Sequence, residues 1–454
     1  MIVMKFGGTS VADAAAITRT ISIVEGKLAQ KPVMVVSACS KVTDCLYKII
    51  SLIEEKKAEE ATQVLEALKA RHVGIVTDLN ESFVEVGDND EEITAKIAQI
   101  CEVINDYILG KAMEACDKAL IISSGEYLSS SIIAYAMNMR GIKTNWVDAR
   151  RMVITDDDYL QAAPLMNQLG AKAKKVVTSS YEGHEAIITQ GFIGATEKGL
   201  PSLLGRGGSD YSASLIGMAI DADRIEIWTD VDGVRSADPR IVKNTKGLHK
   251  LSYEEATEMA RFGAKVLHPL TLEPAQQKNI PVYVLNSMNP TNEGTAILCR
   301  SCVFDGIKTL SYKENIRVIN IYSMKMINTV GFMEKVFTTF ADHKVSVDLL
   351  SSSEASITVT VEASQDVAGV IADLSKFSDV KVDRDKAQVS IIGKNLIGAR
   401  GLLAAVFAAT IDSKIYMISQ DTTYLNLSIV VDRPEMAVVL KKIHQNIFEN
   451  GNIY

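Results

Sequence analysis

The sequence predicts an α/β protein, with a helix-covered sheet over residues 1–296 and two smaller α+β units behind it. Three observations predict this. The chain of 454 residues is too long for one core, so two or three domains are expected. Short apolar strands alternate with helical patterns through the first region, as a helix-covered sheet requires. An internal repeat begins after "GTAILCRSC" (294–302).

The strands expected in the first region are short apolar runs, and several end in small or polar residues, as in "IISSGE" and "IWTDVDG". They are Ile2–Phe6, Val33–Ser37, Ala119–Ser123, Thr144–Asp148, Ala186–Gln190, Arg224–Thr229 and Val282–Leu285. Ligands of open α/β sheets collect beyond the carboxyl ends of strands, so a site is expected in these loops. The stretch 46–118 is helical in period and rich in Glu, Lys and Ala, which predicts an inserted set of helices without chemistry.

The repeat aligns "GFMEKVFTTFADHKV" (331–345) with "GLLAAVFAATIDSKI" (401–415), at an offset of 70 residues. Each copy runs strand, glycine-led helix, strand, strand. The pattern predicts two related units, 297–385 and 386–454, in a pseudo-symmetric arrangement. The end of the chain (435–448) is predicted as an amphipathic helix, and residues from about 432 to 454 are candidates to complete the first unit.

Composition excludes several classes of protein. The net charge of −8 and the lack of basic runs argue against a nucleic-acid partner. No signal-peptide pattern or membrane-spanning apolar run is present, so a cytoplasmic protein without a membrane partner is expected. Six cysteines are sparse for this length, which suits a reducing compartment. Cys299 and Cys302 form one CxxC without a second pair or a histidine at ligand spacing, which argues against a metal or redox role.

The first candidate site is "KFGGTS" (5–10), where a strand ends in Lys5, Phe6, Gly7 and Gly8 before a helical pattern from about Val11. Bare backbone amides and a helix N-terminus beside a lysine suit a phosphate. The spacings G-x-x-x-x-G-K-[ST] and G-x-G-x-x-G are both absent, so neither common nucleotide loop is predicted. The alternative is a tight turn with a lysine whose stem is buried.

The second candidate is "LLGRGGSDYSAS" (203–214), in which Ser209 and Asp210 open a helix to about Ile220. Ser209 could be only an N-cap, and Asp210 only an acid that offsets the helix dipole. Neither explains Arg206, which lies among three glycines. A planar guanidinium beside flexible backbone suits a carboxylate or phosphate ligand.

The third candidate is "WTDVDGVRSADPR" (228–240), where Thr229 and Asp230 follow a strand and suggest a ribose and phosphate edge. A helix with a capping box at Ser252 and Glu255 delivers Lys265 nearby in sequence, although Lys265 could simply compensate that helix's dipole.

Two single residues complete the set. Thr43 lies in the loop after the second expected strand, and Glu126 follows "SSG" at a strand end. Glu126 could be an ordinary helix-start acid, or it could pair with a substrate ammonium.

The motifs "KFGGTS", "SSGE", "GRGGSD", "WTDVDGV…ADPR" and "FGAKVLHP", in this order, resemble those of aspartate kinases of the amino-acid kinase superfamily, over essentially the whole chain. The resemblance implies a three-layer sandwich with a mainly parallel central sheet, followed by two ferredoxin-like ACT domains. It also implies the monofunctional enzyme, without a fused homoserine dehydrogenase.

The reaction that this resemblance implies is phosphoryl transfer from ATP to the side-chain carboxylate of L-aspartate, with Mg²⁺, as the first step toward lysine, threonine and methionine. Such a nucleophile has a pKa of about 3.9 and is already ionised at neutral pH, so it needs no general base. Lysines, amides and a metal on the phosphates should therefore dominate catalysis.

The resemblance also implies roles for single residues. Lys5 resembles the catalytic lysine, and Asp210 the catalytic aspartate that orients it. The nucleotide and phosphate contacts implied are Lys5, Gly7, Gly8, Ser10, Gly207, Gly208, Thr229, Asp230, Arg235, Arg240 and Lys265. The substrate contacts implied are Arg206 for the α-carboxylate, Glu126 for the ammonium and Thr43 for the side-chain carboxylate, together with Ser209. Arg235 stands where a tyrosine is common in the family, which leaves that nucleotide contact open. No protein metal ligand is implied.

An effector site is predicted in the first repeat. Asp348 aligns with Ile418 of the second repeat, and Glu354 with Tyr424, so the first repeat has acids where the second is apolar or aromatic, and a cationic amino acid is expected in the first. Resemblance to lysine-sensitive aspartate kinases implies L-lysine as effector, bound near Met326, Thr329, Gly331, Met333, Ser346, Val347, Asp348, Ser352, Ser353 and Glu354. Val347 and Met333 would also serve as core residues in any such unit.

Feedback inhibition is then expected through a homodimer of ACT pairs, by population shift, with a tetramer left open. Two rival functions stay open: another acyl-phosphate kinase of the superfamily, and a catalytically silent amino-acid sensor.

Overall fold

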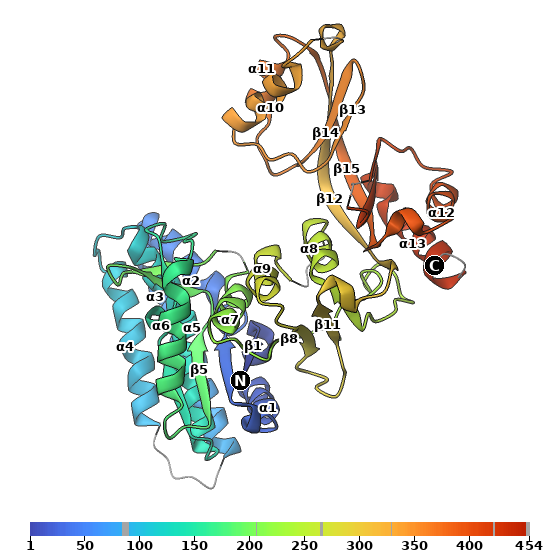
Figure 1. Cartoon of the computed structure of the whole chain (residues 1–454). Coiled ribbons are helices and arrows are strands. Elements are labelled where there is room, and N and C mark those ends of the chain that lie inside the picture. Colours follow the sequence, from blue (N-terminus) through green and yellow to red (C-terminus); the bar gives the residue numbers. More distant parts are fainter. Residues whose placement is uncertain (84–89, 206, 264–266, 328, 421–422, 451–454) are drawn as a thin grey trace. The chain divides into compact units, whose positions relative to one another are not determined.

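The computed structural model describes residues 1–83, 90–205, 207–263, 267–327, 329–420 and 423–450 (Figure 1). Contacts divide the chain into two units. The first consists of Met1–Val234, His249–Tyr253 and Val266–Cys302, and the second of Arg235–Leu248, Glu254–Lys265 and Val303–Tyr454. Arg206 and Lys265, two of the predicted site residues, lie outside the described residues.

The first unit is built on an eight-stranded sheet. Its strands, in spatial order, are β3 (Thr144–Val147), β5 (Ala186–Gln190), β2 (Pro32–Val36), β1 (Ile2–Phe6), β8 (Arg224–Thr229), β10 (Val282–Asn286), β11 (Thr295–Leu298) and β9 (Lys250–Ser252). Neighbouring strands are parallel except for the antiparallel pair β10 and β11. The predicted mainly parallel sheet is thus confirmed.

Successive side chains of the central strand β1 point to opposite faces of the sheet. Ile2, Met4 and Phe6 pack in one core with α1 (Ala14–Glu25) and the helices α2 to α5. Val3 and Lys5 therefore face the other side of the sheet. There, Gly217 of α7 (Gly208–Ala219) lies against Val3 and Ile225, and α7 contacts α6 (Met166–Ser180) and α9 (Pro269–Gln277). Helices cover both faces, which confirms the three-layer sandwich.

The helical stretch predicted at 46–118 contains α2 (Val42–Glu54), α3 (Ala58–Ser82), α4 (Glu91–Ile108) and the start of α5 (Ala115–Met139). The strand predicted at Ala119–Ser123 is wrong, because these residues lie inside α5. This helix is buried on nearly all sides, so its sequence has no amphipathic period and a short apolar run in it looks like a buried strand. The serines of this run did not indicate a helix either, because the hydroxyls of Ser123 and Ser124 are satisfied within it. Both donate to the Leu120 carbonyl.

A separate three-stranded sheet consists of β4 (Ile154–Thr155), β6 (Ile193–Thr196) and β7 (Pro201–Leu203). No helix among the described residues is long and apolar enough to cross a membrane.

The second unit has one six-stranded antiparallel sheet. Its spatial order is β13 (Leu350–Ser352), β14 (Ser356–Glu362), β12 (Gly306–Tyr322), β15 (Asp379–Lys394), β17 (Asn426–Asp432) and β16 (Met417–Gln420). The long strands β12 and β15 run through both repeats, with irregular register between Lys313 and Val318. The helices are α10 (Phe332–Asp342), α11 (Ala368–Leu374), α12 (Leu402–Ala409) and α13 (Met436–His444), and α8 (Tyr253–Arg261) precedes them in the chain.

The glycine-led helices of the repeat are confirmed. Gly331 and Gly401 are the N-caps of α10 and α12, with φ of 85° and 83°. A left-handed backbone at both positions explains why the repeat conserves glycine between its two copies.

Two hydrophobic cores lie under this sheet, one for each repeat. The first gathers α10 and α11 around Ile319 and Val359. The second gathers α12 and α13 around Val389 and Ile429, and it includes Leu310 from the beginning of β12. The C-terminal helix thus packs with the second repeat. The domain boundaries drawn from the sequence stay predictions.

Candidate active site at the strand ends of the first unit

An ion pair between β1 and α7 forms the centre of the candidate site. The Nζ of Lys5 lies 2.5 Å from Oδ1 of Asp210, and the two side chains are 11% and 17% exposed. Strand alternation turns Lys5 toward α7, and Asp210 lies in the first turn of that helix. The carboxylate therefore fixes the direction of an ammonium that is only partly hydrated.

A cavity of about 590 Å³ opens around this pair. Its lining is Lys5, Ser37, Thr43, Tyr47, Glu126, Leu160, Gln161, Phe192, Gly205, Gly207, Gly208, Ser209 and Asp210. The fold thus brings together seven residues predicted from separate motifs: Lys5, Thr43, Glu126, Gly207, Gly208, Ser209 and Asp210.

Two glycines allow α7 to begin at the cavity wall. Gly207 is its N-cap, with φ of 74°, and a Cβ there would lie 2.6 Å from Cβ of His268. A Cβ on Gly208 would lie 2.5 Å from the Phe192 ring. The alternative reading of Ser209 as N-cap is wrong, because the left-handed glycine takes that position and no side chain caps the helix.

Two helix N-termini supply positive ends to the same cavity. Thr43 lies in the first turn of α2 and Ser209 in the first turn of α7, and neither helix has a side-chain N-cap hydrogen bond. Free amides at the start of a helix favour an anionic group such as a phosphate or carboxylate. The cavity therefore has positive ends of its own, although the chain as a whole carries a net charge of −8.

The "KFGGTS" loop is tied to the ends of neighbouring strands. The Gly7 N–H donates to the Trp228 carbonyl at 3.2 Å, so that amide is used within the protein. A Cβ on Gly8 would lie 2.9 Å from the Ala38 carbonyl oxygen, which explains the second glycine. The hydroxyl of Ser10 is buried and lies 2.8 Å from that of Ser287, whose N–H donates to the Thr229 carbonyl.

Glu126 is a buried acid facing the cavity from the middle of α5. It is 3% exposed, and burial raises its pKa to about 8, opposed by backbone hydrogen bonds, first from Ala38. Its Oε2 has no hydrogen-bond partner among the described residues. A buried carboxyl with one oxygen left without a partner suits a cationic group of a ligand. The sequence placed Glu126 on the wrong element but in the right cavity.

The remaining predicted nucleotide contacts divide between the units. Thr229 and Asp230 follow β8 in the first unit, where the Thr229 hydroxyl donates to Asp230 at 3.2 Å. Arg235 and Arg240 belong to the second unit. There Arg235 donates to the hydroxyl and carbonyl of Thr245, and Arg240 to the Asp238 carboxylate.

Tyr47 and Phe192 line the cavity but were not predicted. Tyr47 lies one helical turn after Thr43, a spacing that could have indicated it. Burial and the nearby Glu126 carboxyl raise the pKa of Tyr47. Phe192 has φ of 69° without being glycine, which no sequence pattern reveals.

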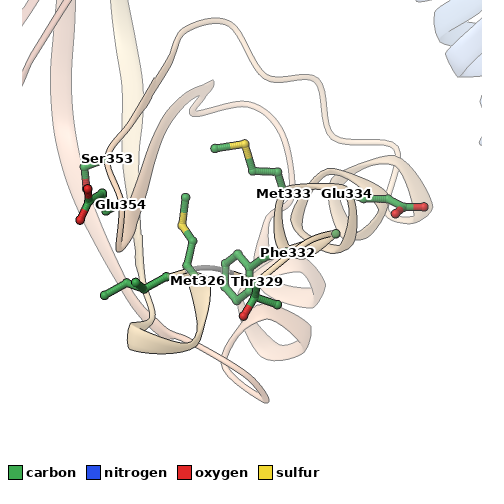
Figure 2. Close-up of a pocket in the computed structure, with 9 residues that line it drawn as sticks. Met326, Thr329, Phe332, Met333, Glu334, Ser353 and Glu354 are labelled. Carbon is green, nitrogen blue, oxygen red and sulfur yellow. The ribbon is translucent and has the colours of Figure 1, made fainter.

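A second cavity, of about 700 Å³, lies in the first repeat (Figure 2). Its lining is Met326, Ile327, Thr329, Gly331, Phe332, Met333, Glu334, Ser353 and Glu354. Six of the predicted effector residues are among them: Met326, Thr329, Gly331, Met333, Ser353 and Glu354. Figure 2 shows Ser353 and Glu354 across from Met333, while the Glu334 carboxylate points away.

Asp348 has a partner in its own chain. The Nζ of Lys313 lies 3.1 Å from the Asp348 carboxylate and 2.9 Å from that of Glu362. Asp348 is not part of the cavity lining, and neither are Ser346, Val347 and Ser352.

Residues 1–286 match the model of the amino acid kinase family, and residues 319–372 and 389–447 match an ACT domain model. The residues matched by the amino acid kinase model include strands β1 to β10 and the whole lining of the cavity around Lys5 and Asp210.

Curated relatives align along nearly the whole chain. Lysine-sensitive aspartokinase 3 of Escherichia coli (strain K12) is 33% identical over 458 residues, covering 99% of both chains. The chloroplastic aspartokinase 1 of Arabidopsis thaliana is 32% identical, covering 99% of this chain and 81% of its own.

Solved structures agree. E. coli aspartokinase III in complex with aspartate and ADP (R-state) superposes with a TM-score of 0.83 at 31% identity, covering 99% of this chain and 100% of that one. The same enzyme with lysine and aspartate (T-state) gives a TM-score of 0.79 with the same identity and coverage. The chain belongs to the amino acid kinase family, and its full-length relatives in that family are aspartokinases.

Proposed function

We propose that this chain is an aspartate kinase, which transfers the γ-phosphoryl group of ATP to the side-chain carboxylate of L-aspartate and releases 4-phospho-L-aspartate and ADP. The observation that carries the proposal is the Lys5–Asp210 ion pair in one cavity with the buried Glu126, whose Oε2 has no partner among the described residues. A cation for phosphates and an acid for an ammonium are the two charges that ATP and an amino acid require.

The chemistry needs positioning more than proton transfer. The attacking carboxylate has a pKa of about 3.9 and is already a nucleophile at neutral pH. Lys5 meets the transferring phosphoryl group and offsets the charge that accumulates there, while Asp210 keeps the ammonium aimed. Amides at Gly8 and Gly207 and the starts of α2 and α7 add further positive ends, whereas the Gly208 N–H donates to the Gly205 carbonyl and only the lack of a side chain at Gly208 leaves room there.

Other residues of the same cavity lining hold the amino acid. Glu126 takes its ammonium, Thr43 its side-chain carboxylate, and Ser209 with Arg206 its α-carboxylate. The assignment of Arg206 rests on the "GRGGSD" motif alone. The proposed nucleotide contacts likewise rest on resemblance of sequence motifs. They are Thr229, Asp230, Arg235, Arg240 and Lys265.

Mg²⁺ is proposed to accompany ATP. The described residues offer no cluster of three or more His, Cys, Asp or Glu side chains that could hold a metal ion. An ion that accompanies ATP is held chiefly by phosphate oxygens and water, as Mg²⁺ commonly is in kinases, where it neutralises phosphate charge.

The test is ADP release with trapping of the acyl phosphate by hydroxylamine. We expect a hydroxamate with aspartate and little with glutamate or N-acetylated amino acids. A preference for one of the latter would favour another acyl-phosphate kinase. Lysine binding without any turnover would indicate a silent sensor.

L-Lysine is the proposed inhibitor, bound in the first-repeat cavity with Glu354 near its cationic group. We also propose a homodimer through the ACT domains. In support, the first repeat exposes several apolar side chains, and exposed apolar surface commonly marks an interface. These are Met324, Ile327, Val330, Met333 and Leu350.

A further inference from the structure

Cys299 and Cys302 lie at the end of the first unit, where the chain passes from β11 to the second unit at Val303. A 3-10 turn, Arg300–Cys302, follows the strand, and the Cys302 N–H donates to the Cys299 carbonyl at 3.0 Å. This turn folds the two side chains back onto each other. The two Sγ atoms lie 2.7 Å apart.

The pair is accessible, which distinguishes it from two other cysteines of the chain. Cys302 is exposed and Cys299 partly exposed, whereas Cys39 and Cys101 are buried. Burial raises the pKa of Cys39 to about 12 and that of Cys101 to about 11, so these thiols stay protonated and unreactive.

The surroundings of the pair favour a thiolate. The hydrogen bond between the two thiols lowers the pKa of Cys299 and raises that of Cys302. The Ser301 hydroxyl lies 3.3 Å from the Cys299 sulfur, and Lys250 acts on Cys302 as a nearby positive charge. A thiolate beside a thiol is the state from which thiol–disulfide exchange starts.

We propose that Cys299 and Cys302 are a dithiol site that small-molecule disulfides, such as oxidised glutathione, convert reversibly to an intramolecular disulfide. The Cys299 thiolate attacks one sulfur of the oxidant, forming a mixed disulfide and releasing one thiolate. Cys302, after losing its proton, attacks the Cys299 sulfur and releases the second thiolate. The protein loses two protons and two electrons, and the oxidant disulfide gains them to become two thiols.

The spacing in the sequence argued against a redox role because it offered no second pair. The structure adds an observation that the sequence spacing could not give: the two sulfur atoms are in contact, on a turn that is accessible to solvent. The resulting ring closes in one of the segments where the chain passes from the first unit to the second, and it is independent of the proposed kinase chemistry.

The test uses the full-length protein equilibrated in glutathione buffers of graded oxidation, then alkylated, unfolded and digested with trypsin without reduction. Trypsin cuts after Arg300, so an oxidised pair appears as peptide 279–300 joined to peptide 301–308. We expect this joined species at oxidant ratios that leave Cys116 alkylated, and its loss on adding excess reduced glutathione. Cys302→Ser should abolish the species, and the matched variant Cys116→Ser should retain it.

A second measurement needs no variant. Phenylarsine oxide bridges two neighbouring thiols, so one equivalent should remove two thiols from the count of a thiol-specific dye and slow alkylation of Cys299 at least about tenfold. If the joined peptides never form, or form only when Cys116 oxidises as well, the proposal is overturned. Arsenical uptake without the loss of two thiols would also overturn it.

Discussion

Lys5 carries the charge on which the proposed transfer depends. Replacing it by alanine removes the only described cation in the cavity lining that faces Asp210. We expect Lys5→Ala to lower kcat roughly a hundredfold or more, as loss of a preorganised electrostatic group does. Steady-state ADP release measures this, with aspartate binding by calorimetry as the control for folding. A near-normal kcat would remove Lys5 from the mechanism.

Glu126 makes aspartate use dependent on pH. Its carboxyl has a pKa of about 8 in the substrate-free protein, so it is mostly neutral at pH 7 and pairs poorly with an ammonium. We expect kcat/KM for aspartate to rise as pH increases toward about 8, relative to Glu126→Gln measured in parallel. A ratio of wild type to Glu126→Gln that is flat with pH would contradict this assignment.

The burial of Glu126 also predicts how the stability of the protein changes with pH, and this trend is an independent control on the raised pKa of Glu126. The folded chain keeps a proton on Glu126 that the unfolded chain releases above about pH 4.5, so this group's contribution to stability is lost as pH rises toward about 8. Glu126→Gln lacks that loss. The difference in melting temperature between Glu126→Gln and wild type should therefore increase, in favour of the variant, as pH rises from about 4.5 to about 8.

The start of α7 is the element that most constrains the site. A Cβ on Gly208 would meet the Phe192 ring at 2.5 Å, so Gly208→Ala must displace either the helix start or Phe192. We expect a loss of about 1–3 kcal/mol in stability together with a fall in kcat. Chemical denaturation and turnover measure the two effects.

Gly170 provides the matched control for that substitution. It lies within α6, and a Cβ there would meet nothing within 4 Å. Gly170→Ala should leave kcat unchanged and stabilise the protein by about 0.5–1 kcal/mol. Equal effects of the two substitutions would show that the start of α7 has no special role.

Lys313, in strand β12, forms an ion pair with Asp348 of the same chain. If Asp348 also recognises a cationic effector, Lys313 competes with that effector for the carboxylate. We expect Lys313→Met to increase the apparent affinity for L-lysine several-fold, because a partly buried acid then lacks a partner. Inhibition curves with the variant measure this. An unchanged curve with lowered melting temperature would make the pair purely structural.

The proposed inhibition involves the whole molecule, because the cavity proposed for lysine and the cavity proposed for aspartate lie in different units. Lysine must shift a population of conformations rather than touch the substrate. We expect millimolar lysine to inhibit, and Glu354→Gln to weaken inhibition about tenfold or more while activity without lysine is retained. Threonine is the comparison effector. Full wild-type activity at millimolar lysine would count against the proposal.

The sequence determined the α/β class, the parallel strands with their site-bearing ends, the repeat and its glycine-led helices. These are local properties, since period, turn chemistry and capping act over a few residues. It misplaced Ala119–Ser123 because a helix buried on all sides has no amphipathic period.

Only the tertiary structure decided which of the chemical groups meet. Lys5 and Asp210 are 205 positions apart in the sequence, and strand alternation together with the packing of α7 turns them toward each other. Tertiary packing also buries Glu126 and gives Asp348 a lysine partner from a distant part of its own chain. Burial and proximity across the fold are long-range properties that no local pattern encodes.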